Sequence, residues 1–532
     1  MQEVVIDVRD RGARPIEEPE RRRRRPVGAR ASAWLACAAL VAGVGGLACA
    51  SAIRPAAQDF WRVETRDFEI LSAFGEQPTR ELARELQLFH AGVLAALGLD
   101  RSPDWFPRTR VLAFDDRIPG RPFAVDGQAS MYVPGVDQGT IVFRVPGGWD
   151  ERASWTLKTD YARQLVRSRS RERLPLWLEE GLAQVAAAST IEKGGIWLGA
   201  LVDSHYAEIQ DWKRGDLSSV LQETDLSRVS DRGREVFRAH AWALVHTLMF
   251  DAATARGTQS FPGAFWRDWD ARAGMVPGLV VRDLLEGEGA GTGAEWGERT
   301  RRHFEEKDFA LRVLREQDWN LEALVLEPVS FPEAATWLGD LALALGRPAL
   351  AVTQFDQALE VDPTAVQARA GLAAALATTE DFAYAEHNAI RAIRGIQASG
   401  ARDARVLRRA GRSYLEGARE TRDPEESARR LAEAARRLHE SLALDPTSAQ
   451  AHLDLARVAL ERGESFEEVA RQLEAARQLR PHALEIELVA IRLELQQGRQ
   501  TAVRLRAEDL LSRTTWRPYQ AEARALLEAA RG

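Results

Sequence analysis

The sequence predicts an α+β domain followed by an all-α domain of repeated helical hairpins, with a membrane-directed segment in front of both. Three observations lead to this prediction. An uncharged stretch at residues 31–53 follows a basic N-terminus, and short alternating segments typical of strands occur between residues 59 and 145. From residue 331 onwards, apolar residues at helical spacing repeat about every 34 residues.

Length and composition set the limits of the prediction. A chain of 532 residues is long enough for two or three domains with a large core. A net charge of −7 gives no broad basic surface for nucleic acid. The only two cysteines, Cys37 and Cys49, lie in the apolar stretch, so the rest of the chain has neither disulfides nor a cysteine zinc site.

Residues 1–30 are predicted to be a disordered basic tail. They are polar, with scattered prolines and a run of arginines at residues 21–25, and such a segment cannot bury enough apolar surface to fold. By the positive-inside rule, the arginines keep this tail in the cytoplasm.

Residues 31–53 are long enough to span a bilayer, and three outcomes stay open. The stretch remains as a single-span anchor, or signal peptidase cuts near residues 48–50, or Cys49 becomes a lipid-modified N-terminus. Residues 46–49 resemble a lipobox, although Gly46 stands where an aliphatic residue is usual. All three outcomes place residues 54–532 outside the cytoplasm.

The first folded region begins with strand and helix signals. Apolar residues alternate around Val63, Phe68 and Ile70, which predicts a strand, and a long amphipathic helix starts at Thr79. A short strand is predicted at residues 109–114. Residues 131–133 and 140–145 are expected to pair across a glycine-containing turn.

Residues 155–188 predict two helices joined by a short basic bend. Leu157, Tyr161 and Leu165 share one face of the first helix. The second helix opens at residues 174–177 (LPLW), and the residues Glu179 and Glu180 lie in its first turn, where the helix dipole favours negative charge.

The segment LPLWLEEGLAQ at residues 174–184 resembles the second half of the gluzincin metallopeptidase motif, in particular the peptidase-MA-like families of bacterial envelope proteins. Those families carry HExxH on the preceding helix, with zinc bound by two histidines and by a glutamate of the second helix. The resemblance implies a gluzincin-like domain over residues 58–315, in which a small mixed sheet packs beside the active-site helix. It places Glu180 at the position of the third ligand.

The first half of the motif is degenerate here. Where HExxH is expected, the chain has Thr159 and Arg163 at the two histidine positions and Asp160 at the catalytic glutamate position, and Gln184 replaces a later glutamate. Arginine stays protonated and cannot ligate, so we expect zinc to be lost and the domain to be an inactive pseudo-metallopeptidase. We hypothesise that Arg163 takes over the electrostatic role of the metal by pairing with Glu180 or Asp160. The alternative is that Glu180 only favours a helix start and that Arg163 is solvated.

Histidines offer a further alternative. The predicted helix at residues 237–248 resembles one that these families carry downstream, and His240 and His246 lie on it six residues apart, which turns them away from each other. A rebuilt metal site would use Glu180, His205 and His240. Residues 252–293 look loop-rich, with a flexible insertion at residues 287–293.

The C-terminal region, residues 330–530, resembles tetratricopeptide (TPR) repeats. Small residues allow paired helices to approach, large ones fill the gap, and proline ends the second helix. Five helical pairs are expected; the third is stretched by a polar insert near residues 419–426, the fifth runs from 484 to 512, and residues 518–531 cap the stack. The clearest unit has its consensus residues at Leu338, Gly339, Ala351, Phe355, Ala358 and Pro363.

Together these features predict an envelope-anchored protein–protein interaction scaffold that binds a protein or peptide through the concave face of the repeats. Two alternatives stay open. One is an active zinc metallopeptidase with an atypical site, and the other is a periplasmic protein that binds a small ligand in the vacated cleft.

Overall fold

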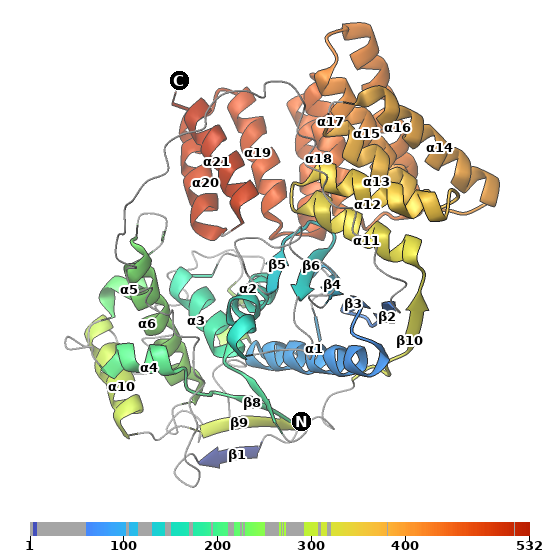
Figure 1. Ribbon diagram of the computed structural model, residues 1–532. Coiled ribbons are helices and arrows are strands. Elements are labelled where there is room, and N and C mark those ends of the chain that lie inside the picture. The colour runs from blue at the N-terminus through green and yellow to red at the C-terminus, as the bar shows by residue number, and fades with distance from the viewer. Residues whose placement is uncertain are drawn as a thin grey trace, which may run out of the picture.

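The predicted strands and the predicted helical hairpins form two domains that pack against each other (Figure 1). The structure is a computed structural model of the chain. It describes residues 4–7, 60–99, 101–102, 106–114, 130–143, 151–169, 174–192, 195–210, 217–223, 226, 229–250, 265–267, 269, 271–272, 292–306, 310–315, 321–379, 381–514 and 516–531.

A six-stranded mixed sheet lies at the centre of the α+β domain. Its strands are β2 (Phe60–Glu64), β3 (Phe68–Ser72), β4 (Thr109–Ala113), β5 (Ser130–Val133), β6 (Gly139–Phe143) and β10 (Leu326–Val329). The order is β10-β2-β3-β4-β6-β5, with β3–β4 and β4–β6 parallel and the other neighbours antiparallel. The expected small mixed sheet and the expected β5–β6 pair are therefore confirmed.

The stretch from residue 59 to 72 forms two strands, so the prediction of a single strand there was wrong. The Thr65 hydroxyl accepts a hydrogen bond from the Phe68 amide at 3.0 Å, and this contact closes a turn between β2 and β3. Four consecutive polar residues, ETRD at 64–67, interrupt the alternation and mark this turn in the sequence. The following helix, α1 (Glu76–Ala96), begins directly after Gly75 and not at Thr79, which lies within its first turn.

Helices cover the sheet and form the core around α3. Every residue of α3 is buried, and α3 packs against both α2 and α6. The expected pair of helices around residues 155–188 is confirmed, although the first of them starts four residues earlier than predicted. The helices of this domain beyond α1 are α2 (Glu151–Arg169), α3 (Leu176–Ala187), α4 (Asp203–Gln210), α5 (Ser218–Gln222), α6 (Asp231–Phe250) and α10 (Gly293–Glu306).

A second, antiparallel sheet has the order β1-β9-β8-β7. Its strands are β1 (Val4–Asp7), β7 (Thr190–Glu192), β8 (Gly195–Leu198) and β9 (Ala310–Arg315). The prediction that residues 1–30 form only a disordered tail is wrong for residues 4–7, where a short β-branched run pairs with β9.

The predicted membrane-directed segment lies outside the described residues, and so do Cys37, Cys49 and residues 287–291 of the insertion predicted at 287–293, whose last residue, Gly293, begins α10. Within the part of the chain that the structure describes, none of the helices is both long and apolar enough to cross a bilayer.

The C-terminal domain is an all-α solenoid of antiparallel helix pairs, which confirms the expected hairpins. Gly339 and Gly371 let their helices approach the Phe355 ring, because a Cβ at either position would lie within 2.5 Å of it. The pairs are α11 (Phe331–Ala344) with α12 (Pro348–Val361), α13 (Val366–Ala377) with α14 (Phe382–Ser399), α15 (Ala404–Glu420) with α16 (Pro424–Leu444), α17 (Ala449–Glu461) with α18 (Phe466–Leu479), and α19 (Leu484–Gln496) with α20 (Gln500–Arg513), followed by α21 (Arg517–Ala529).

The polar insert of the third pair lengthens its helices and does not form a loop. Helices α15 and α16 have 17 and 21 residues, whereas α11 and α12 have 14 each. The turn between α15 and α16 is short because Asp423 caps α16, accepting a hydrogen bond from the Glu425 amide at 3.0 Å.

The first pairs of the solenoid pack directly on the sheet. Leu71, Leu112 and Val142 of the sheet belong to one buried cluster with Trp337 and Leu338 of α11. Because β10 completes this sheet, the α+β domain extends to residue 329, beyond the predicted limit of 315. The two domains therefore share a hydrophobic core.

Candidate functional site

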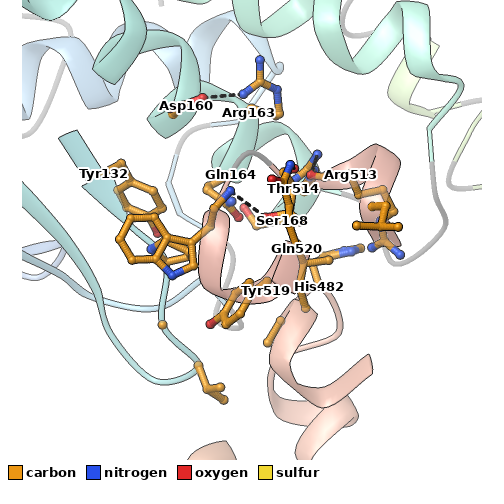
Figure 2. Close-up of a pocket in the computed structure, with 18 of the residues that line it drawn as sticks. Tyr132, Asp160, Arg163, Gln164, Ser168, His482, Arg513, Thr514, Tyr519 and Gln520 are labelled. Atoms are coloured by element: carbon orange, nitrogen blue, oxygen red, sulfur yellow. Dashed lines mark hydrogen bonds and ion pairs between the residues drawn. The ribbon is translucent and has the colours of Figure 1, made fainter. Parts of the chain in front are cut away.

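The residues that the resemblance places at zinc-motif positions lie together on α2 and α3. The Arg163 guanidinium donates to both carboxylate oxygens of Glu180, through Nε at 2.8 Å and Nη2 at 3.0 Å, and through Nη1 to Asp160 Oδ1 at 2.6 Å. Figure 2 shows Arg163 directed toward Asp160. The expected pairing of Arg163 with the two acids is confirmed, and the alternative of a solvated Arg163 is wrong.

This ion pair is buried, which makes each partner necessary to the other. Glu180 is 5% exposed and Arg163 is 6% exposed. Burial alone raises the pKa of Glu180, but the charges of Arg163 and then Arg238 outweigh burial, so that the pKa lies below its usual range. Glu180 is therefore a carboxylate held by a guanidinium, in the place where the family motif implies a metal ligand.

The two remaining motif positions lie in the same region. Thr159 is 5% exposed, and its Oγ1 has no hydrogen-bond partner within the described residues. The Gln184 amide oxygen lies 3.2 Å from His205 Nε2. These contacts fix Gln184 and His205 to each other and not to the Arg163–Glu180 pair.

A second buried ion pair lies one turn further along α2, and it was not predicted. Arg167 Nη2 lies 2.6 Å from Glu179 Oε1 and also donates to the Arg513 backbone oxygen of the solenoid at 2.7 Å. The sequence held a signal for this pair, because Arg167 follows Arg163 by four residues and Glu179 precedes Glu180. The pair ties the degenerate motif to the C-terminal helices.

The structure does not assemble a metal site from the histidines. His246 Nδ1 lies 2.9 Å from His303 Nε2 and its Nε2 lies 2.9 Å from the Gly199 oxygen. Burial lowers the pKa of His205, His240 and His246 to about 4 in each case, so all three are neutral at pH 7. Among the described residues, no three His, Cys, Asp or Glu side chains lie close enough together to hold a metal ion, and Glu180 with His205 and His240 forms no such group.

A cavity of about 670 Å³ opens from the motif toward the solenoid. One wall comes from α2, α3 and α6, and the opposite wall comes from the α18–α19 loop, the residues before α21 and α21 itself. Figure 2 shows Gln164 and Ser168 of α2 facing His482, Tyr519 and Gln520 of the solenoid. The cleft of the α+β domain is thus closed on one side by the C-terminal helices.

A smaller cavity of about 430 Å³ lies between the sheet and helices α11, α13 and α15, the first helices of the first three pairs. Arg110 bridges Glu69 of the sheet at 3.1 Å and Asp340 of α11 at 2.9 Å, and Arg409 of α15 reaches the same Asp340 at 2.6 Å. Arg405, an exposed residue of α15, also lines this cavity. The sheet therefore already covers part of the surface that the first helices of the solenoid form.

The turn between β5 and β6 also contacts the solenoid. The Asp137 carboxylate accepts hydrogen bonds from the Ser448 hydroxyl at 2.6 Å and from the Gln450 amide at 3.2 Å, at the start of α17. Neither this contact nor the far wall of the larger cavity was predicted, since residues more than 300 positions apart leave no local pattern.

No protein-family model matches the chain, and no curated protein matches it. Among solved structures, the chain is similar to a thermophilic TPR protein, TTC0263, of Thermus thermophilus, with a TM-score of 0.33 and 22% identity over 37% of this chain and 99% of that chain. It is also similar to PilF of Pseudomonas aeruginosa, with a TM-score of 0.27 and 21% identity over 37% of this chain and 88% of that chain.

Proposed function

We propose that this chain is a protein–protein interaction scaffold, in which a non-catalytic peptidase-like domain supports a solenoid of tetratricopeptide type. The observation that carries the proposal is the solenoid itself, a stack of helix pairs whose first helices line a long surface. Stacks of this kind offer extended surfaces for peptides or partner domains.

The Arg163–Glu180 pair supports the non-catalytic part of the proposal. A guanidinium that donates to both oxygens of Glu180 places a positive charge beside that carboxylate, and this charge opposes the approach of a metal cation. Residues at three positions that would bind or activate zinc-bound water in the family motif have changed together, namely Thr159, Asp160 and Arg163. An atypical zinc peptidase would need a different set of ligands.

The smaller cavity beside α11, α13 and α15 is the proposed entry point for a partner segment. It lies on the first-helix face, as expected for a concave surface, and it carries both signs of charge, with Arg405 and Arg409 beside Asp340 and Asp362. A polar extended peptide would find hydrogen-bond donors and acceptors there. Since the sheet already covers part of this face, the partner contacts both domains at once.

Affinity purification of the full chain from its own cells tests the proposal. We expect a specific partner to co-purify with the wild type and with Arg402→Glu, and to be lost with Arg405→Glu, because both arginines are exposed near the start of α15 but only Arg405 lines the cavity. Recovery of the partner by all three chains would exclude this surface. Failure of any protein to exceed an unrelated solenoid control would exclude the scaffold function.

Elemental analysis tests the non-catalytic part. The full chain is exposed to zinc, desalted and compared with Glu180→Ala. We expect less than one zinc per ten chains in both. One zinc per chain that disappears in Glu180→Ala would mean a rebuilt site, and peptidase assays with and without a chelator would follow.

The proposed location is the bacterial cell envelope, with residues 31–53 as the membrane-directed segment. The uncharged stretch after an arginine run supports this location. Labelling of intact cells with a membrane-impermeant amine reagent would distinguish an external C-terminal domain from an internal one.

A further inference from the structure

The charged side chains around the larger cavity are mostly basic. Seven arginines and two carboxylates line it, and three of the arginines also pair with carboxylates outside the lining, namely Arg167 with Glu179, Arg234 with Asp231 and Arg513 with Asp509. The carboxylates are Asp160 and Glu180, and both already bind Arg163. The arginines are Arg163, Arg167, Arg234, Arg238, Arg480, Arg513 and Arg524.

Two of these arginines have N–H groups that the described residues leave unused. Arg480 Nε and Arg238 Nε are buried and have no hydrogen-bond partner within the described part of the chain. Arg238 Nε lies 3.6 Å from Glu180, whose oxygens Arg163 already occupies. Burial lowers the pKa of Arg480 more than the charges of Asp137 and Asp445 raise it. The nearby carboxylates therefore only partly stabilise the positive charge of Arg480. The guanidinium groups themselves are not fully enclosed, since the Arg238 side chain is 32% exposed and Arg480 Nη1 donates to the Leu479 oxygen at 2.9 Å, so both can turn further N–H groups to an anion.

Apolar and aromatic side chains form part of the remaining wall. Phe106 and Tyr132 come from the α+β domain, while Trp516, Tyr519 and Leu527 come from the end of the solenoid. Aromatic faces beside arginines suit a ligand that is planar or aliphatic at one end and anionic at the other. A cavity of about 670 Å³ also lies within the usual size range for small organic ligands.

We propose that this interdomain cavity is a binding site for a small organic anion, with a carboxylate or phosphate head held by Arg238 and Arg480 and an apolar body against Trp516 and Tyr519. Arg163 is part of this site, since its positive charge, with that of Arg238 beside Glu180, offsets the two acids that would otherwise repel the ligand. The site is distinct from the partner surface, so this inference does not rest on the proposed scaffold function.

Calorimetric titration of the purified full chain tests the site with four probes: phenyl phosphate, hydrocinnamate, the neutral hydrocinnamyl alcohol and inorganic phosphate. We expect at least one of the two aromatic anions to bind with a Kd of about 1 mM or tighter. The preferred head group separates a phosphate ligand from a carboxylate ligand. Saturable binding of neither anion, or equal binding of the alcohol, would overturn the proposal.

Variants then assign the contacts. The double variant Arg238→Gln with Arg480→Gln should weaken binding of the aromatic anion about tenfold or more, because it removes two charge-assisted contacts. Arg471→Gln, an exposed arginine of α18 outside the cavity, is the matched control and should leave the Kd unchanged. Trp516→Ala should weaken phenyl phosphate more than inorganic phosphate. Equal losses in the control and the double variant, at unchanged melting temperature, would place binding elsewhere.

Discussion

Arg163 lies where the family motif implies a metal ligand, and it holds two acids at once. A buried carboxylate that loses its only strong partner is destabilising by roughly 3–5 kcal/mol. We therefore expect Arg163→Gln to lower the free energy of unfolding by about that amount, measured by urea denaturation. Arg163→Gln combined with Glu180→Gln should recover a large part of the loss, because the buried charge of Glu180 is then absent and the two charges that lose a partner, Asp160 and Arg238, are partly exposed.

The control for this prediction is an exposed arginine. Arg471 of α18 pairs with Glu468 at the surface, where salt bridges contribute little, so Arg471→Gln should give no measurable change. If Arg163→Gln is as harmless as Arg471→Gln, the Arg163–Glu180 pair is not what stabilises the junction of α2 and α3.

Buried histidines make a separate prediction about acid sensitivity. His205, His240 and His246 have pKa values of about 4 in the folded chain because of burial, against about 6.5 in the unfolded chain. Between these values the unfolded state binds more protons than the folded state, so stability falls as the pH falls from 6.5 toward 4. The expected loss between pH 7 and pH 5 is about 2 kcal/mol per histidine.

Denaturation at a series of pH values checks this prediction with His246→Gln beside the wild type. The variant should have a smaller pH slope between pH 6.5 and 5, whatever its stability at pH 7. An identical slope would mean that His246 titrates normally in the folded chain.

The contact between α3 and α6 depends on a single glycine. A Cβ added at Gly181 would lie 2.4 Å from the Ala241 backbone oxygen and 2.5 Å from Val245 Cγ2. Backbone cannot move aside cheaply, so Gly181→Ala should destabilise the chain by about 1–3 kcal/mol. Gly417→Ala is the matched control in α15, because its Cβ would lie 3.3 Å from the flexible end of Arg430 and in ordinary contact with Phe382 at 3.5 Å. It should be neutral or slightly stabilising. Thermal unfolding of both variants measures the difference, and equal melting temperatures would contradict the close approach of α3 and α6.

Elements with a clear period could be predicted from the sequence, and contacts between distant elements could not. The helices around residues 155–188 and the hairpins after residue 331 follow from apolar spacing alone. The Arg163–Glu180 pair could be predicted because both residues belong to one short motif. Arg480 and Trp516 could not be placed near it, since nothing local marks which surface a solenoid packs against. The turn at Thr65 could have been predicted, since four consecutive polar residues at 64–67 interrupt the alternation there.

At the scale of the whole molecule, the pairing of β1 with β9 and a membrane span at residues 31–53 exclude each other. Val5 of β1 lies opposite Arg312 of β9, so both strands must be in one compartment. If residues 31–53 span a membrane with the N-terminus in the cytoplasm, β1 and β9 are on opposite sides. Synthesis proceeds at about 5–20 residues per second, so residue 53 leaves the ribosome roughly 15–50 s before residue 310. If residues 31–53 insert into a membrane as proposed, insertion therefore precedes the β1–β9 pairing.

We therefore expect β1 to pair with β9 only when no membrane is present during synthesis. Cysteines at positions 5 and 312 (Val5→Cys, Arg312→Cys), in a chain with Cys37→Ser and Cys49→Ser, should cross-link through a short bismaleimide after cell-free synthesis. The cross-link should disappear when bacterial inner-membrane vesicles are added before translation. The pair Trp197→Cys with Val313→Cys is the control, because β8 and β9 lie on the same side in either case. A β1–β9 cross-link of equal yield with vesicles present would contradict a membrane span between the two strands, since a chain threaded through the bilayer cannot bring residue 5 to residue 312.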